Sequence, residues 1–227
     1  AASDVYKRQS ESEETGQAFI TVDEAGQNTI LVYGGANMTL SATDVEMSVD
    51  AFIGADFVVA QLEVPFEAIE QAFKIARKQN ITTVLNPAPA IELPKSLLEL
   101  TDIIIPNETE AELLTGISIN NESDMKETAT YFLDLGISAV LITLGEQGTY
   151  CAYQEQYKMI PACNVKAIDT TAAGDTFIGA FLSELNKDLS NIESAIRLAN
   201  QASSLTVQRK GAQASIPTRK EVEAEYN

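Results

Sequence analysis

From Ala55 onward, the sequence alternates regularly between two hydrophobic periods. Short apolar runs typical of strands are separated by segments with the 3.6-residue period of amphipathic helices. The expected strands are residues 57–61, 83–85, 102–105 and 139–143, and the expected helices are 67–78, 108–114 and 122–135. Strand–helix alternation of this kind predicts an α/β fold in which helices cover both faces of a mostly parallel sheet.

The segments on either side of this alternation predict antiparallel strands and two long helices. Residues 148–153 and 157–160 predict a hairpin, and the long helices are expected near 173–186 and 192–208. Before Ala55, two alternating runs, Gln17–Val22 and 29–33, flank a polar turn and predict a second hairpin. We expect one domain over residues 15–227 with a small β appendage near 17–33.

Residues 1–14 differ from the rest of the chain. Ser10 to Glu14 are polar and acidic, and residues 4–9 resemble the translation of a transposon adapter used in sequencing libraries. We expect a non-native or disordered leader here, and a natural flexible terminus is the alternative.

Charge and composition exclude several classes of function. The net charge of −18 argues against non-specific nucleic-acid binding, which needs a basic surface. No apolar run approaches the length of a membrane span, so we expect no membrane association. The two cysteines form no disulfide framework, which favours a cytoplasmic location. Because the chain has no histidine, a general base near neutral pH is expected to be a carboxylate, Lys, Tyr or Cys, and carboxylates are the leading candidates.

The segment Asp-Thr-Thr-Ala-Ala-Gly-Asp-Thr-Phe, residues 169–177, carries the strongest chemical signal. It opens the expected helix 173–186, where unpaired N–H groups and the helix dipole can hold a phosphate without lysine or arginine. Gly174 can adopt strained backbone angles, and Asp175 is well placed to take a proton from an attacking hydroxyl. The alternative is that Asp175 only stabilises the first helical turn.

Five motifs in order resemble the ribokinase-type, or phosphofructokinase-B-type, carbohydrate kinase family. Besides residues 169–177 they are Asn-Pro-Ala-Pro-Ala (86–90), Pro-Asn-Glu-Thr-Glu-Ala-Glu (106–112), Ile-Thr-Leu-Gly-Glu-Gln-Gly (142–148) and Arg-Lys-Gly-Ala-Gln (209–213). The resemblance implies a ribokinase-like three-layer sandwich with a β-sheet lid, acting as an ATP-dependent phosphotransferase.

The resemblance also implies residue roles. Asp175 is the expected catalytic base and a substrate ligand, Glu63 is a second sugar-side carboxylate, and Glu110 is expected to reach Mg²⁺ through water. The anion hole is expected from the amides of Ala172, Ala173, Gly174 and Asp175. The nucleotide set is Asn107, Thr143, Leu144, Gly145, Glu146, Gln147, Gly148, Gly174 and Asn200. The expected K⁺ ligands are Asp169, Thr171, Thr206, Arg209, Gly211 and Ser215, mostly through backbone carbonyls.

Each of these roles has a plainer alternative. Asn107 and Glu110 also fit a helix cap with first-turn acids, and residues 143–148 also fit a generic turn. Asn200 can be a solvated helix position, and Glu63 an ordinary loop residue.

The motifs around residues 86–90 and 209–213 imply ribose as the sugar. The expected reaction converts ATP and D-ribose to D-ribose 5-phosphate and ADP, with Mg²⁺ as cofactor, K⁺ as activator and a homodimer formed through the lid. A deoxyribose, fructose or nucleoside kinase is the nearest alternative, and an inactive sugar- or nucleotide-binding regulator is the other.

The family's amino-terminal sugar-binding elements, an Asp after the first strand and a Gly-Gly-x-Gly-x-Asn run, are not found in this chain. Gly34-Gly35-Ala36-Asn37 does not replace them, because it follows the expected lid. We therefore expect an amino-terminally truncated kinase that is inactive as written and whose sugar specificity cannot be read directly.

Overall fold

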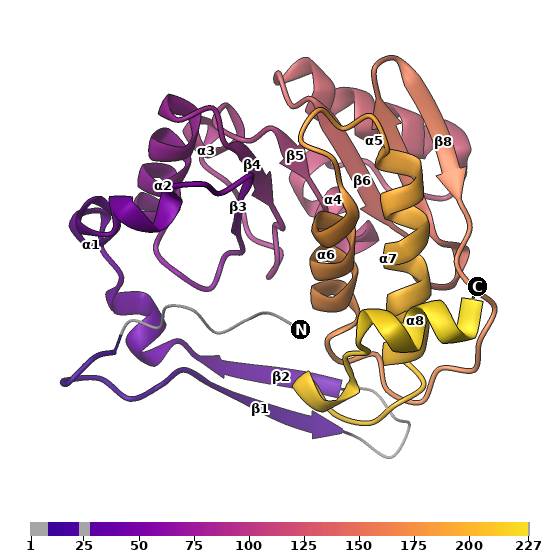
Figure 1. Cartoon of the computed structure of the whole chain (residues 1–227), viewed down its shortest axis with the longest axis horizontal. Helices are drawn as coiled ribbons and strands as arrows, with labels where there is room; N and C mark the ends of the chain where they lie inside the picture. The colour runs from indigo at the N-terminus through magenta and orange to yellow at the C-terminus, as the bar shows by residue number, and fades with distance from the viewer. Residues whose placement is uncertain (1–8, 23–27, 227) are drawn as a thin grey trace.

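The computed structural model describes residues 9–22 and 28–226, and a six-stranded mixed sheet lies at its centre (Figure 1). Strands β3, β4, β5 and β6 run parallel, and β7 and β8 continue the sheet antiparallel, in that spatial order. The strands are β3 (Phe57–Ala60), β4 (Thr82–Leu85), β5 (Ile103–Ile104), β6 (Ala139–Thr143), β7 (Thr149–Tyr153) and β8 (Gln156–Ile160). The predicted sheet and its antiparallel hairpin are confirmed.

Helices cover both faces of this sheet, as predicted. The core clusters place α2 (Phe66–Lys78), α3 (Lys95–Leu98), α4 (Glu108–Thr115) and α5 (Glu122–Asp134) on one face. On the other face lie α6 (Ala173–Glu184) and α7 (Ile192–Thr206), with α8 (Arg219–Tyr226) packed against α7. Figure 1 shows α6 and α7 side by side in front of β6.

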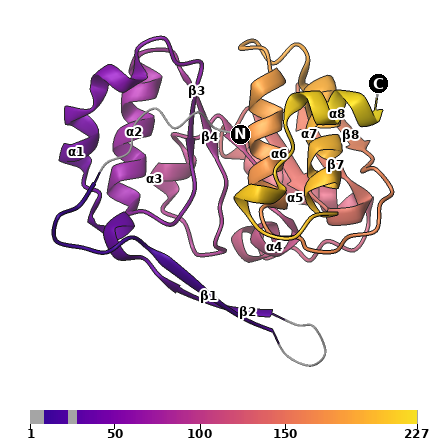
Figure 2. The ribbon, with the colours of Figure 1, turned by 60° about the horizontal axis from the view of Figure 1, so that its bottom comes forward.

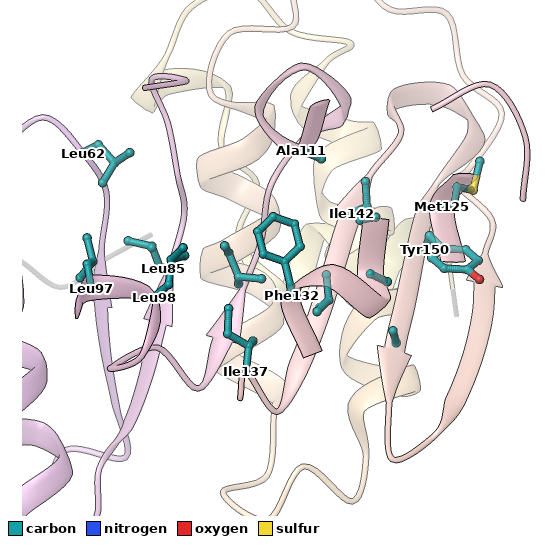
Figure 3. Close-up of a cluster of buried hydrophobic side chains, with 14 of the residues drawn as sticks. Leu62, Leu85, Leu97, Leu98, Ala111, Met125, Phe132, Ile137, Ile142 and Tyr150 are labelled. Carbon is teal, nitrogen blue, oxygen red and sulfur yellow. The ribbon is translucent and has the colours of Figure 1, made fainter. Parts of the chain in front are cut away.

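Successive residues of the central strands point to opposite faces and build two separate cores. In β6, Val140 and Ile142 join the cluster with Phe132 of α5, which Figure 3 shows in close-up. Ala139 and Leu141 join the second cluster, beneath α6 and α7. The strands are therefore apolar on both faces, which is typical of a sheet buried between helical layers.

A separate two-stranded sheet projects from this body (Figure 2). It pairs β1 (Gln17–Val22) with β2 (Asn28–Tyr33), so the predicted hairpin is confirmed. Its turn, residues 23–27, lies outside the described residues. Phe19 is 53% exposed and lies opposite Leu31, which is 70% exposed, so the hairpin carries apolar surface in solvent.

The segment after the hairpin contains short helices that the hydrophobic pattern did not indicate. These are η1 (Gly35–Thr39), α1 (Ala42–Met47) and η2 (Val49–Phe52). Helix α1 begins at a capping box in which Ser41 and Asp44 each bond the other's backbone N–H. Two further short 3-10 helices are η3 (Gly145–Gln147) and η4 (Gln213–Ser215).

Three predicted helices are shorter in the structure than in the sequence pattern, and the first of them, α5, ends at Asp134 rather than 135. Helix α6 ends at Glu184 rather than 186, because Leu185 is already extended. Helix α7 ends at Thr206 rather than 208, and residues 207–212 form a loop. Within the predicted leader, residues 1–8 lie outside the described residues and 9–14 form no helix or strand. Over the described part of the chain, no helix combines the length and apolar character that crossing a bilayer requires.

Candidate active site

The carboxyl ends of β5 and β6 bring two predicted site residues together. Asn107 follows β5 and forms an isolated parallel bridge with Thr143, the last residue of β6. The N–H of Thr143 donates to the carbonyl of Pro106 at 2.9 Å. In open α/β sheets, ligands bind at this carboxyl edge.

Asn107 also begins helix α4 through a capping box with Glu110. The Asn107 side chain accepts from the Glu110 N–H at 2.8 Å, and the two Glu110 carboxylate oxygens accept from the Asn107 N–H and amide at 2.8 and 2.9 Å. Burial raises the pKa of Glu110 above its usual range, although the hydrogen bond from the Asn107 N–H opposes the shift. Asn107 and Glu110 therefore do form a helix cap, as the plainer alternative expected. The Glu110 carboxylate still has lone pairs that can accept from a further donor.

Beyond Thr143, residues 144–148 form a tight loop that is closed by its own backbone. Leu144 N–H donates to Gly148 O at 2.8 Å, and Gly148 N–H donates to Gly145 O at 3.2 Å. Gly148 has φ +111°, and a Cβ there would lie 2.2 Å from the carbonyl of Ile160. Only glycine allows the loop to approach the end of β8 so closely.

Asn200 is buried rather than solvated, so that alternative is wrong. The side chain is on α7 and is 7% exposed. Its Oδ1 accepts from the Thr149 hydroxyl at 3.0 Å, and its Nδ2 donates to the carbonyls of Ile160 and Pro161, both at 3.1 Å. The amide thus joins α7 to the base of the 144–148 loop.

The start of α6 presents two exposed backbone donors beside a carboxylate. The N–H groups of Gly174 and Asp175 have no hydrogen-bond acceptor among the described residues, and both residues are exposed. The N–H of Ala173 donates instead to Thr170 O at 3.2 Å. Such free donors at a helix start favour an anion.

The backbone strain expected at Gly174 lies at another residue. Gly174 has no positive φ, whereas Ala172, the residue before the helix, is left-handed with φ +62°. An ideal Cβ on Gly174 would meet nothing within 4 Å. The glycine therefore leaves the space above the two free N–H groups open, and Ala172 makes the turn.

The segment before α6 is held to the loop after α7. Asp169 accepts from the N–H groups of Thr171 at 3.0 Å and Gly211 at 3.0 Å, and the N–H of Asp169 donates to Val207 O. The hydrogen bond from Gly211, followed by those from Thr171, lowers the pKa of Asp169 to about 2. The structure thus brings Asp169, Thr171 and Gly211 together, as the cation prediction requires.

The other predicted cation ligands, Thr206, Arg209 and Ser215, make hydrogen bonds and ion pairs with other residues. The Thr206 hydroxyl, fully buried, donates to the Thr176 hydroxyl at 3.0 Å, and the Thr206 carbonyl accepts from the Arg209 N–H. The Arg209 guanidinium pairs with Glu221 at 2.8 Å. The hydroxyl of Ser215, also buried, donates to Ala212 O at 2.6 Å.

Glu63 is the predicted residue that the structure does not join to the others. It is exposed, and its carboxylate has no hydrogen-bond or ionic partner in the described ranges 9–22 and 28–226. The neighbouring Leu62 N–H donates to Ala88 O at 2.8 Å, which links the β3 loop to the 86–90 motif. No group of three or more acidic, Cys or His residues able to hold a metal is found among the described residues.

Two supporting residues were not predicted. Ser203 on α7 donates to the Ala173 carbonyl at 3.0 Å, and Thr149 holds the Asn200 amide. For Ser203 the available signal was the spacing of polar residues at 200, 203 and 206 on an otherwise apolar helix face, and Thr149 had no such signal.

Comparison with known proteins decides the family. A model of the pfkB family carbohydrate kinases matches residues 3–219. The chain belongs to this family. This pfkB family member is 65% identical over 208 residues to a ribokinase of Staphylococcus aureus (strain COL). The alignment covers 92% of this chain and 68% of that protein.

A further relative and a solved structure are also similar to this pfkB family kinase. A deoxyribokinase of Salmonella typhi is 35% identical over 205 residues, covering 90% of this chain and 67% of that protein. The solved structure of Arabidopsis thaliana ribokinase complexed with ribose and ATP has a TM-score of 0.83 at 33% identity, covering 94% of this chain and 69% of that one. The ribokinase-like α/β fold is therefore confirmed.

Proposed function

We propose that this chain serves the ATP-dependent phosphorylation of D-ribose to D-ribose 5-phosphate. The observation that carries the proposal is the start of α6, where the exposed Asp175 carboxylate lies beside two unpaired N–H donors. The 65% identity to a ribokinase, against 35% to a deoxyribokinase, supports ribose as the sugar. The Arabidopsis relative, solved with ribose and ATP, supports the pair of substrates.

In this mechanism a sugar hydroxyl attacks the γ-phosphorus of ATP. The hydroxyl proton passes to the Asp175 carboxylate, the bond to the β-phosphate oxygen breaks, and ADP leaves. The N–H groups of Gly174 and Asp175 stabilise negative charge on the transferred phosphoryl oxygens. Residues 144–148 contact the nucleotide, and Glu63 is the proposed carboxylate on the sugar side.

The residues present fit a magnesium ion that is held indirectly. Two of the Glu110 carboxylate lone pairs are taken by Asn107, and the remaining ones can accept from water on the metal. Magnesium in phosphoryl-transfer sites keeps several waters and few protein ligands. Bound with ATP, it would neutralise charge on the phosphates.

A potassium ion is proposed beside the anion hole, where Asp169 meets the 209–211 loop. The support is that the contact from Asp169 to Gly211 brings three of the predicted ligands, Asp169, Thr171 and Gly211, together. A cation there would add positive potential to the start of α6.

Two properties of the whole protein complete the proposal. The exposed apolar pairs of the β1–β2 hairpin, such as Phe19 and Leu31, support a homodimer in which two hairpins cover each other. A cytoplasmic location is supported by two unpaired thiols, one of which, Cys151, is buried with its pKa raised to about 12.

The test is ribose-dependent ADP release, measured for the chain and for a version extended by the upstream segment of the Staphylococcus aureus relative. The chain spans 68% of that relative's length. Deoxyribose, fructose and adenosine are the competing substrates, and Asp175→Asn is the matched control in each version. We expect ribose to give the highest kcat/KM. Nucleotide binding with no turnover of any sugar in either version would favour a regulator and overturn the proposal.

A further inference from the structure

Helix α8 is attached to both α6 and α7. Val222 is buried and packs against α7, and Figure 1 shows α8 crossing the end of that helix. The hydroxyls of Tyr226 and Ser204 lie 2.6 Å apart, which adds a polar contact with α7. Arg219 forms an ion pair with Glu184 of α6 at 2.8 Å. Helix α8 is therefore fixed in place beside the loop that connects it to α7.

Glu221, in the first turn of α8, binds two different parts of the chain with its two carboxylate oxygens. Oε2 accepts from the N–H and the hydroxyl of Thr218 at 2.7 and 2.8 Å, which fixes the side chain at the start of the helix. Oε1 accepts from the Arg209 guanidinium at 2.8 Å. The bonds from Thr218, followed by that from Arg209, lower the pKa of Glu221 to about 2, so the carboxylate is ionised near neutral pH. Arg209 is thus paired with a charge whose position α8 has already set.

Arg209 lies in the middle of the loop 207–212, whose backbone is held at both ends. At its start, the Val207 carbonyl accepts from two N–H groups of the segment before α6, at 2.7 and 3.1 Å. Near its end, the Gly211 N–H donates to Asp169 at 3.0 Å. Between these points, the Arg209 N–H bonds back to the last turn of α7. Among the described residues, the Arg209 guanidinium makes the loop's one hydrogen bond to α8.

Two carbonyls in the middle of this loop are unused. Those of Arg209 and Gly211 accept no hydrogen bond from any residue in the ranges 9–22 and 28–226. Both belong to the proposed K⁺ ligands, so their orientation affects the affinity for the cation. A rotation of the backbone at Arg209 would move the first carbonyl directly and the second through one intervening residue. Residues that orient metal ligands from outside have large effects on metal affinity.

We infer that Glu221 is a positioning residue for the proposed cation site, because its ion pair with Arg209 holds the carbonyls of the 209–211 segment in place. The inference rests on the proposed function, since it assumes that this loop binds K⁺. It gives α8 a role in that site, although none of its residues belongs to the predicted ligand set.

The ion pair is suited to a clean test because both partners are partly exposed. Arg209 is 36% exposed and Glu221 is 46% exposed, and pairs of this kind contribute little to the free energy of unfolding. Removing the pair should therefore leave the chain folded. Its effect should appear in the affinity for the cation.

The experiment is thermal unfolding of the whole chain in mixtures of potassium and choline chloride at constant ionic strength. A ligand that binds only the folded state stabilises it by an amount set by the ratio of its concentration to Kd, so the melting temperatures give an apparent Kd for K⁺ without any turnover. Glu221→Gln and Arg209→Gln each remove the ion pair. Glu223→Gln is the matched control, because Glu223 is also 46% exposed and pairs with Arg219 at the same 2.8 Å.

We expect Glu221→Gln and Arg209→Gln each to raise the apparent Kd for K⁺ about tenfold, the lower end of the range for residues that orient metal ligands. The double variant should match the single ones, because both changes remove the same contact. Glu223→Gln should leave the Kd unchanged. A purely structural role would lower the melting temperature equally in potassium and in choline chloride and would not change the Kd.

An unchanged Kd in both single variants would overturn the inference. A rise with Glu223→Gln as large as that with Glu221→Gln would also overturn it, since the charge of α8 rather than this contact would then set the affinity. If one single variant does not fold, the other decides. No K⁺-specific stabilisation of the unaltered chain would overturn the proposed cation site together with this inference. Ribose phosphorylation is judged separately, by ADP release.

Discussion

The carboxylate of Asp169 accepts a hydrogen bond from the backbone N–H of Gly211, 42 residues further along the chain, at 3.0 Å. A second bond, from the Thr171 N–H, holds the other oxygen. One side chain therefore fastens the segment before α6 to the loop after α7. Because both bonds favour the ionised carboxylate, this contact responds to acid.

Replacing Asp169 by Asn should lower the stability of the folded chain at neutral pH but not near pH 2. The folded-state pKa of Asp169 is about 2, below its ordinary value of 3.8. The contribution is therefore present above pH 3.8 and is lost as the pH falls through about 2. Melting temperatures of the unaltered chain and Asp169→Asn should differ at pH 6 and converge toward pH 2. A constant difference across this range would contradict the assignment.

Asp175→Asn should lower kcat by at least about a hundredfold, the usual range for loss of a general base. The affinity for ATP should change little, because the amide keeps the shape and removes a negative charge near the phosphate. The measurement is steady-state kinetics with ribose on the extended version. Turnover close to that of the unaltered enzyme would show that Asp175 is not the base.

If Asp169 and the 209–211 loop hold K⁺, activity should be much higher in potassium chloride than in sodium or choline chloride at equal ionic strength. Asp169→Asn should remove most of that difference. Equal rates in the three salts would eliminate the cation site.

Gly174→Ala should separate stability from nucleotide binding. Alanine gains roughly 0.5–1 kcal/mol over glycine within a helix, and an ideal Cβ at Gly174 meets nothing within 4 Å. The melting temperature should therefore hold or rise, while the methyl group obstructs the phosphate and weakens ATP binding. Gly179→Ala, on the same helix and equally open, is the control that should stabilise without affecting ATP. Equal ATP affinity in both variants would contradict the anion hole.

The sequence predicted the sheet and its covering helices because their hydrophobic periods are long and regular. The short helices α1 and α3 were not predicted, because each is too brief to show a hydrophobic period. Helix α1 is defined instead by a local contact, the Ser41–Asp44 capping box. The sequence indicated only that Gly174 can adopt strained backbone angles, and the residue that is left-handed in the structure is Ala172, because backbone angles depend on how α6 is anchored rather than on residue type alone.

The motifs that form the site were predicted from the sequence, but the hydrogen bonds that connect them were not. Local patterns identified Asn107 and Glu110, whose contacts are three residues apart. The Asn200–Thr149 contact joins residues 51 positions apart, and no local pattern could show it. The solvated alternative for Asn200 failed because burial depends on which helix face meets β7 and β8.

Strand β6 is apolar on both faces, so polarity alone does not choose its alignment with β5. A slip by one residue would exchange Val140 and Ile142 with Ala139 and Leu141 between the two cores, and all four are acceptable in an apolar layer. The bridge between Asn107 and Thr143, with the bond from Thr143 to Pro106, anchors the end of the pairing. Asn107 and Thr143, which are proposed to contact ATP, therefore also fix the register in which β6 pairs with β5. Changes to this segment are expected to affect correct folding as well as catalysis.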